Sequence, residues 1–355
     1  MKIIIVATPQ AKGHHKSYFE LCVNSLIKKE HSVVSITQEK HDIQVNKQYY
    51  IQNNMGTRRL SEYLKMVKEL RNIIEIERPD AIHIQCGDNF YRFMGIGLSF
   101  LKKYRTFFSF HQYRNKIVTP LYFKLLGNLS KGCMVHSEIL KTHLEEWHIP
   151  NVNYVRWPQT VKMKQYPTEV AKEFFGINKD SVVLAYIGGT GYVKGLDILL
   201  ESLKGLEIDF TLLIAGVELD FKKDFITSTC EGYKNKVKLA LKYLTDDELN
   251  YAFCAADYIV LPYRKSFEAG SGILTNAVWM RKPVIAADRG ELGKVVKNNE
   301  LGYLFEPENK KDLRVKISNA IKSKYVWNQM AEKYREAISP EYFMDRYNEM
   351  LTISN

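Results

Sequence analysis

Two short glycine-containing segments carry the residue types that bind phosphate groups. The first, GGTGYVKG at residues 188–195, combines a flexible backbone with Lys194, and the second, GSG at residues 270–272, directly precedes an apolar helical run. A lysine, exposed backbone N–H groups and the positive end of a helix dipole all favour an anion. These segments predict a nucleoside diphosphate site. An ordinary strand-to-helix turn capped by Ser271 would have the same local sequence.

Histidines and a lysine stand in two further segments that could contact a substrate. The segment AKGHH at residues 11–15 is basic and flexible, and His111 directly follows the apolar run FFSF. An imidazole can donate a hydrogen bond to a sugar hydroxyl, but a histidine after a strand is often a packed polar residue. Neither glycine segment has the GxGxxG or GK[ST] fingerprint, so the combination of segments carries the prediction.

The elements that must position these segments alternate between short apolar runs and amphipathic helices. This alternation predicts parallel sheets with crossover helices, in two similar halves. Ligands of such folds bind at the carboxyl ends of the strands, where all four segments fall. Strands are predicted at 2–6, 32–36, 81–84, 106–110, 132–135, 182–187, 210–215, 236–239, 258–261 and 283–287, with a further segment at 154–157, and helices at 16–29, 60–77, 91–103, 118–128, 196–204, 246–255, 273–280 and 311–321.

Length and composition are those of a two-domain cytosolic protein. The 355 residues suffice for two cores, and two prolines bracket a polar connection between Pro158 and Pro167. The five cysteines are widely spread and mostly lie in apolar runs, which predicts reduced thiols. The first apolar run, in MKIIIVATPQ, is too short for a signal peptide, and no segment is long enough to cross a bilayer.

The net charge of +11 predicts an anionic partner, or else only a solvated basic surface. The basic residues are interpreted as scattered, and no zinc-finger spacing or RNA-binding signature occurs, which argues against nucleic acid. Residues Tyr91 to Arg105 and Arg114 to Lys131 mix aromatic, aliphatic and basic side chains. They suit either an interfacial helix on anionic lipid or helices packed on the sheet.

In order and spacing, these segments resemble the retaining glycosyltransferases of family 4, which have the GT-B fold. The resemblance covers nearly the full chain and includes RPDAIHIQ, FSFHQY, VHSEILKTHL and YIGGTGYVKGLDILLESL. Its strongest part is PYRKSFEAGSGILTNAVWMRKPVIAADRGELGKVVKNNELGYLFEPENKKDL, which is similar to the family's E-x(7)-E segment. It implies two Rossmann-like, doubly wound parallel-sheet domains that face across a cleft. Residues 1–160, with a helix at 340–355 crossing back, would hold the acceptor, and residues 161–339 would bind the nucleotide sugar.

The resemblance also implies roles for individual residues. His111 and Glu268 would contact the reacting sugar, and Lys194 would neutralise the diphosphate of the leaving nucleotide. The full set implied is His111 and Glu268 as catalytic residues; Gly189, Thr190, Lys194, Arg264, Ser271 and Gly272 at the diphosphate; Ala215, Gly216, Tyr243, Leu244 and Asn276 at the nucleoside; and Lys12, Gly13 and His14 in an acceptor-side loop.

Several positions depart from the family's pattern. The family's second glutamate falls on Asn276. An amide still accepts a hydrogen bond from the ribose, but it lacks the charge assistance of a carboxylate, which is worth roughly 1 kcal/mol. The arginine usual in the second glycine loop of the family falls on Gly189, and Arg264 on the facing loop either replaces it or is an ordinary surface arginine. Arg281 and Lys294 replace a glycine and a glutamate. The pattern is that of a divergent member that keeps its activity.

The implied reaction is transfer of a sugar from a nucleotide-diphosphate sugar to a glycan or lipid-linked glycan, with retention, in surface polysaccharide or glycoconjugate synthesis. The sequence contains no Asp-x-Asp and no metal-ligand spacing, so neither a metal nor another cofactor is expected. We expect a cytoplasmic protein, peripheral at the inner face of the cell membrane. The alternatives are a catalytically impaired nucleotide-sugar-binding protein and a GT-B nucleotide-sugar epimerase.

Overall fold

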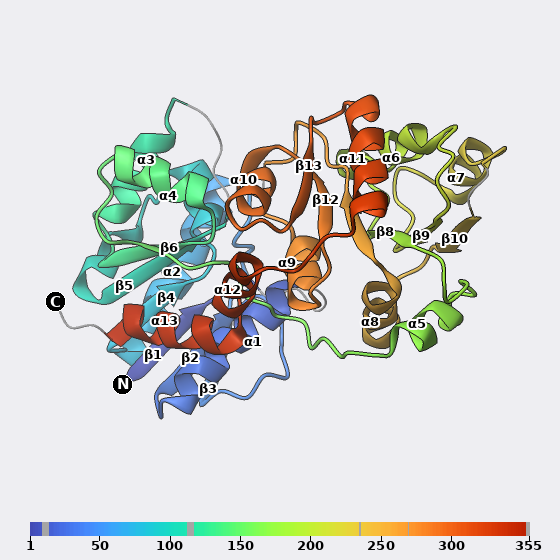
Figure 1. Ribbon diagram of the computed structural model, residues 1–355. Helices are drawn as coiled ribbons and strands as arrows, with labels where there is room; N and C mark the ends of the chain where they lie inside the picture. Colours follow the sequence, from blue (N-terminus) through green and yellow to red (C-terminus); the bar gives the residue numbers. More distant parts are fainter. Residues whose placement is uncertain (9–13, 112–116, 234–235, 269, 353–355) are drawn as a thin grey trace. The chain divides into compact units, whose positions relative to one another are not determined.

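The computed structural model describes residues 1–8, 14–111, 117–233, 236–268 and 270–352. The chain divides into two compact units, which we call unit 1 (Met1–Thr160 with Ser339–Asn355) and unit 2 (Val161–Ile338). Lys12 and Gly13 lie outside the described residues, as do residues 112–116 directly after His111. Each unit is built on one parallel sheet (Figure 1).

The described part of unit 1 forms a seven-stranded sheet in the order β3-β2-β1-β4-β5-β6-β7, and every neighbouring pair is parallel. Its inner strands read as continuous apolar runs because helices cover both faces. The strands are β1 (Lys2–Val6), β2 (Ser32–Thr37), β3 (Lys47–Tyr50), β4 (Ala81–Ile84), β5 (Arg105–Phe110), β6 (Gly132–Val135) and β7 (Val152–Tyr154).

Two helices from opposite ends of the chain cover one face of this sheet. They are α1 (His14–Lys28) and the C-terminal helix α13 (Pro340–Thr352), which lies beside α1 (Figure 1). Asn348 of α13 donates a hydrogen bond to the Ser25 carbonyl at 3.0 Å. The other face is covered by α2 (Leu60–Glu77), the 3-10 helices η1 (Gly87–Phe93) and η2 (Leu98–Lys103), α3 (Thr119–Gly127) and α4 (Glu138–Glu146).

The sheet of unit 2 has six strands in its described part, in the order β10-β9-β8-β11-β12-β13, again all parallel. The strands are β8 (Val183–Ile187), β9 (Thr211–Ala215), β10 (Lys236–Ala240), β11 (Tyr258–Leu261), β12 (Val284–Ala287) and β13 (Gly302–Phe305). One face packs α5 (Thr168–Phe174), α8 (Asp246–Ala255), α9 (Gly272–Trp279), α10 (Gly290–Asn298) and α12 (Gln329–Ala337). The other packs α6 (Leu196–Leu203), α7 (Lys223–Thr229) and α11 (Lys310–Ser323), with η3 (Tyr192–Lys194) before α6.

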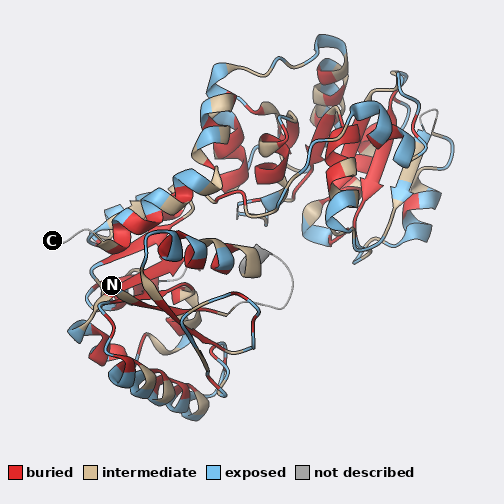
Figure 2. Cartoon of the chain, turned by 90° about the horizontal axis from the view of Figure 1, so that it is seen from below, coloured by how far each residue is buried: buried red, intermediate tan, exposed pale blue. Residues whose placement is uncertain are grey.

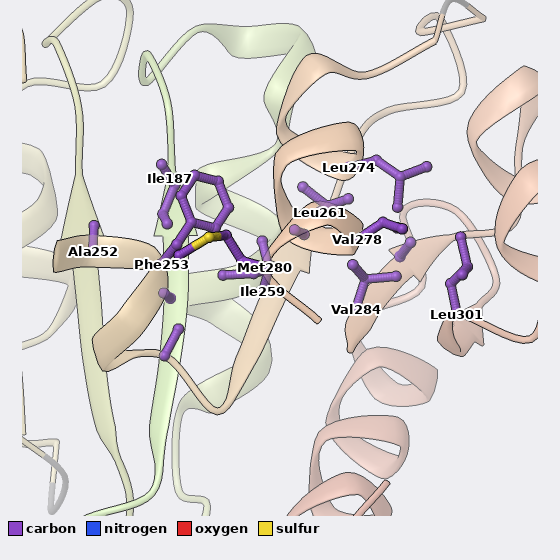
Figure 3. Close-up of a cluster of buried hydrophobic side chains, with 14 of the residues drawn as sticks. Ile187, Ala252, Phe253, Ile259, Leu261, Leu274, Val278, Met280, Val284 and Leu301 are labelled. Atoms are coloured by element: carbon purple, nitrogen blue, oxygen red, sulfur yellow. The ribbon is translucent and has the colours of Figure 1, made fainter. Parts of the chain in front are cut away.

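Both units follow the burial pattern of a doubly wound sheet. In Figure 2 the inner strands are buried and the helices are exposed on their outer faces. Figure 3 shows part of the unit 2 core, where Phe253 of α8 and Met280 after α9 pack near Ile187 and Ile259 of the sheet. This layered arrangement confirms the predicted α/β fold class.

Two parts of unit 1 differ from the sequence prediction. The helix predicted at residues 91–103 is two 3-10 helices, because Gly95 and Gly97 between them adopt positive φ angles of 69° and 84°. Strand β3 and helix α4 were not predicted. The strand β3 is a half-exposed edge strand without an apolar run, and α4 begins where the Ser137 side chain caps Leu140 N at 3.2 Å.

Candidate functional site

The two glycine-containing segments meet at one edge of the unit 2 sheet. The strand order reverses between β8 and β11, so the loops that follow these two strands are neighbours. Gly195 has a φ of 66°, and a Cβ at this position would lie 2.0 Å from the Pro262 carbonyl oxygen. A Cβ on Gly188 would lie 3.8 Å from Ile273 in the first turn of α9. The topology therefore brings together two segments that are about 80 residues apart in the sequence.

Lys194 lies on two aromatic rings in this edge. Its Nζ is 3.9 Å from the ring centroid of Tyr263 and 4.1 Å from that of Phe267. Burial lowers the pKa of the ammonium to about 8. Because Lys194 forms no ion pair with the described part of the chain, it is a desolvated cation that an anionic ligand would stabilise.

The N-terminus of α9 is joined to Lys194 through Tyr263. The Tyr263 hydroxyl is 3.1 Å from the Ser271 Oγ, which caps α9 by accepting from Leu274 N at 3.3 Å. The N–H groups of Gly272 and Ile273 have no hydrogen-bond partner within the described residues. A Cβ on Gly272 would meet no atom within 4 Å, so the approach to these N–H groups is open.

Other residues predicted at the nucleoside lie near this edge or on the strand beyond it. Gly216 directly follows β9 at Ala215, and a Cβ on it would lie 2.1 Å from the Gly188 carbonyl oxygen. Asn276, one turn into α9, is 7% exposed, and no described residue bonds its side-chain amide. Tyr243 is exposed and Leu244 is half-buried, both in the segment after β10.

Three side chains predicted at the donor are engaged within the protein. The Thr190 hydroxyl donates to the Phe221 carbonyl at 2.7 Å, so that it ties the loop after β8 to the loop after β9. Arg264 pairs with Asp197 at 2.6 Å. Glu268 is 61% exposed and accepts from Arg289 at 2.7 Å.

Gly189 stands where the resemblance places an arginine, and a side chain added at this position would meet Leu219. A Cβ there would lie 2.8 Å from Leu219 Cδ1, so a longer side chain would displace Leu219.

In unit 1, His111 stands directly after β5 and is held on both sides. Its Nε2–H donates to the Gln85 carbonyl at 2.8 Å, and its backbone N–H donates to Asp88 at 2.9 Å. Its ring is stacked on His136, with centroids 5.5 Å apart and planes inclined by 19°. The imidazole is thus pre-oriented at the carboxyl edge of the sheet. His14 is the first residue of α1, and its side chain lies outside the described residues.

Two buried histidines near His111 were not predicted as part of this edge. His136 donates from Nδ1 to the Val155 carbonyl at 2.7 Å and accepts from the Tyr18 hydroxyl at 2.8 Å. His83 lies 2.7 Å from the Tyr347 hydroxyl of α13 and 2.8 Å from Ser109 Oγ. Burial lowers the pKa of each to about 3, so both are neutral. In the sequence, only their positions, within β4 and just after β6, indicate that these two histidines lie near His111.

The positive charge of unit 1 is concentrated in one stretch of its sequence. Residues 89–137 contain eight Lys or Arg and no Asp or Glu, so this stretch contributes +8 of the net +11. The layer formed by η1, η2 and α3 also exposes Ile117 fully and Leu121 and Leu125 by 55% and 41%. This corrects the interpretation of the basic residues as scattered. None of the helices in the described chain is both long and apolar enough to cross a membrane.

The described residues contain neither a disulfide nor a cluster of metal-ligand side chains. All five cysteines are free, and Cys22, Cys133 and Cys254 are buried. No group of three or more His, Cys, Asp or Glu in the described ranges is arranged to hold a metal ion.

The fold is that of the GT-B glycosyltransferases. A glycosyltransferase from Rickettsia africae aligns over 99% of both chains with a TM-score of 0.76 and 18% identity. Anabaena HepE in complex with UDP and glucose aligns over 98% of both chains with a TM-score of 0.71 and 15% identity. At these identities the alignments establish the fold alone.

Residues 167–339, which fall almost entirely in unit 2, match the family model described as "Glycosyl transferases group 1". An uncharacterized glycosyltransferase from Methanocaldococcus jannaschii is 24% identical over 63% of this chain and 59% of its own. Lipopolysaccharide 1,2-N-acetylglucosaminetransferase from Salmonella typhimurium is 24% identical over 49% of this chain and 52% of its own. The chain thus spans between half and three-fifths of the length of these relatives.

Proposed function

We propose that this protein is a retaining glycosyltransferase of family 4 that transfers a sugar from a nucleoside diphosphate sugar to a glycan or lipid-linked glycan. One observation carries this proposal: Lys194 and the open first turn of α9 share Tyr263 at the topological switch point of unit 2. That site lies within the group 1 glycosyltransferase match. The alignment with HepE, whose structure contains UDP and glucose, supports a nucleotide-sugar donor.

In this proposal the donor diphosphate lies between the Lys194 ammonium and the N–H groups of Gly272 and Ile273. These groups supply positive charge where the leaving nucleotide develops negative charge, so we propose that the reaction needs no metal ion. The nucleoside then extends towards Asn276 and Gly216, with Ala215, Tyr243 and Leu244 further along the same edge.

We assign the sugar to His111 and Glu268, and the acceptor to unit 1. His111 is held by Gln85 and Asp88, so a hydrogen bond from a sugar hydroxyl to its Nδ1, the acceptor nitrogen of the neutral ring, would need little reorganisation. Retention would place the departing phosphate oxygen and the acceptor hydroxyl on the same face of the sugar, with the phosphate taking the proton.

The acceptor that fits unit 1 is a lipid-linked glycan at an anionic membrane surface in surface polysaccharide synthesis. The exposed residues Ile117, Leu121 and Leu125 form an apolar stripe within the stretch 89–137, which lacks acidic residues, with Lys124 between them on α3. Apolar insertion combined with several cations is what a peripheral protein uses on anionic lipid. The Salmonella relative, which by its name acts on lipopolysaccharide, supports this acceptor class.

Donor binding and turnover test the reaction. The purified protein is incubated with UDP-, GDP-, ADP- and TDP-sugars, and the melting temperature and the release of nucleoside diphosphate are recorded. We expect one donor to raise the melting temperature and to be slowly hydrolysed. Failure of every donor to bind would refute the proposal. A product with the sugar still on the nucleotide but epimerised would indicate an epimerase.

Vesicle cosedimentation tests the membrane surface. Vesicles of phosphatidylcholine with and without phosphatidylglycerol are compared for the wild type and for the double variant Leu121→Ser, Leu125→Ser. We expect binding to the anionic vesicles only, and its loss in the variant. Ile27→Ser on α1 is the matched control, because Ile27 is 41% exposed on the opposite face of the sheet. Equal binding of all three proteins would remove α3 from the proposal.

A further inference from the structure

Arg264 makes an unusual set of contacts with the turn that carries Lys194. Its backbone N–H donates to the Val193 carbonyl at 3.0 Å, and its Nε donates to the Tyr192 carbonyl at 2.9 Å. Its guanidinium also stacks on the Tyr192 ring, 3.8 Å from the centroid. Thus one residue of the loop after β11 holds two of the three residues of η3.

The charge of Arg264 is already compensated. The guanidinium pairs with Asp197 in the first turn of α6 at 2.6 Å and lies 3.9 Å from Glu308, and the side chain is only 11% exposed. A diphosphate that approached this guanidinium would also approach two carboxylates. Arg264 is therefore poorly suited to attract the donor by its own charge.

Lys194 depends on the turn for its place on the aromatic rings. The turn η3 is only three residues long and has no side-chain cap at its N-terminus. Within it, Lys194 N donates to the Gly191 carbonyl at 2.9 Å, and Asp220 accepts from Tyr192 N at 2.6 Å. Further contacts to this turn come from Arg264 and from the rings of Tyr263 and Phe267 in the same loop.

We propose that Arg264 is a positioning residue, which clamps η3 so that the Lys194 ammonium stays on the faces of Tyr263 and Phe267, and that it does not itself bind the diphosphate. This rests on the proposed function for the identity of the ligand. It differs from the expectation that Arg264 replaces the missing arginine at Gly189. The ion pair between Arg264 and Asp197 then holds the loop after β11 against the segment that follows β8.

The environment of Lys194 can be measured without any donor. Reductive methylation with 13C-formaldehyde gives each lysine a resonance whose pH titration reports its pKa, and loss of one resonance in Lys194→Arg assigns it. In the wild type we expect a midpoint near 8, as burial on the two rings dictates. In Arg264→Met we expect the midpoint to move up towards that of an exposed lysine, about 10.4.

Several charged groups near the turn that carries Lys194 could also affect its titration. Asp197 and Glu308 face Arg264, Asp220 accepts from Tyr192 N, and Glu268 pairs with Arg289. Asp197→Asn in the Arg264→Met background separates release of the turn from exposure of an unpaired carboxylate. An unchanged Lys194 midpoint in both variants would overturn the proposal.

A double-mutant cycle then separates positioning from direct binding. Affinity for the preferred nucleotide sugar is measured in the wild type, Arg264→Met, Lys194→Met and the double variant. We expect Arg264→Met to lower affinity about tenfold in the wild type and less than about twofold in Lys194→Met. Equal losses in both backgrounds would show that Arg264 contacts the diphosphate directly.

Two controls complete the design. Arg264→Lys keeps the charge but not the planar fork, so it should lose most of the affinity that Arg264→Met loses, whereas a simple charge effect would be rescued. Arg281→Met removes another ion-paired arginine of unit 2, bound to Glu332 at 2.8 Å, and should leave affinity unchanged. If no donor binds the wild type, the proposed function fails while the lysine titration still decides the role of Arg264.

Discussion

The two sheets of this protein share a strand order but carry different side chains at their carboxyl edges. In both, the order reverses beside the first strand, between β1 and β4 in unit 1 and between β8 and β11 in unit 2. Unit 1 places histidines and aromatic rings at or near this edge, and buried His83 and His136 have their ring nitrogens bonded within the protein. Unit 2 places glycines, a desolvated lysine and an open helix N-terminus there.

The distribution of histidine sharpens this difference. All nine histidines lie between residues 14 and 148, so unit 2 contains none. Unit 2 therefore offers an anion a permanent helix dipole and one titrating cation, whereas unit 1 offers neutral hydrogen-bonding groups. The shared topology supplies the edge, and the residues on each edge decide which ligand it suits.

The largest expected effect separates turnover from donor binding. His111→Phe should lower turnover on the order of 100- to 1,000-fold, as loss of one aligned transition-state contact does, and change donor affinity less than about twofold. Nucleoside diphosphate release and isothermal titration measure the two quantities. His143→Phe on α4, whose ring stacks on Trp147, is the control. A fall in donor affinity of the same size would place the donor diphosphate on unit 1.

Lys194→Met should weaken donor binding, which His111→Phe leaves nearly unchanged. Loss of a charge-assisted contact costs roughly 2 kcal/mol, so donor affinity should fall about thirtyfold. Titration calorimetry measures this fall. Lys204→Met, which removes an exposed lysine paired with Glu201, should have no effect. Unchanged affinity in Lys194→Met would leave the α9 N-terminus as the sole anion site.

Donor affinity should also depend on pH through Lys194. Only the protonated lysine attracts the diphosphate, and its pKa is about 8, so affinity should be constant below pH 7 and fall as pH rises through 8. The limiting slope is at most tenfold per pH unit. Lys194→Arg should abolish the fall between pH 7 and 9. A wild-type profile that is flat to pH 9 would mean that Lys194 is not in contact with the donor.

Mild acid should destabilise unit 1 and spare unit 2. His83 and His136 have pKa values lowered to about 3, while an unfolded histidine titrates near 6.5. Their contribution to the free energy of unfolding is complete above pH 6.5 and is lost as pH falls towards 3. Hydrogen exchange, corrected for intrinsic rates, should therefore show faster opening of unit 1 at pH 5 than at pH 7. Equal acceleration of unit 2 peptides would contradict this.

The smallest expected effect has opposite signs for stability and binding. Gly272→Ala places a methyl group in open space at the first residue of α9, so α9 should be stabilised by up to roughly 1 kcal/mol. The same methyl group obstructs the N–H groups and should weaken donor binding several-fold. Thermal unfolding with and without donor measures both. Gly205→Ala is not a neutral control because its φ is 68°, whereas Ser228→Ala on α7 is suitable.

Much of this edge could be predicted because its signals are local. The helix at 60–77 and the strand at 81–84 coincide with α2 and β4, since apolar periodicity directly reflects which side chains face the sheet. The sequence also indicated that Lys194 and Ser271 flank one site. It could not show that Tyr263 connects them, because an aromatic residue after a strand has many packing partners.

The sequence by itself determined the two parallel sheets, the segments at their carboxyl ends and the residue types available to bind an anion. Only the tertiary structure decided how those residues are used. Arg264 is engaged by Asp197, 67 positions away, and His83 by Tyr347, 264 positions away. Such pairings depend on distances that chain topology sets, and a linear pattern contains no information on which charge is already compensated.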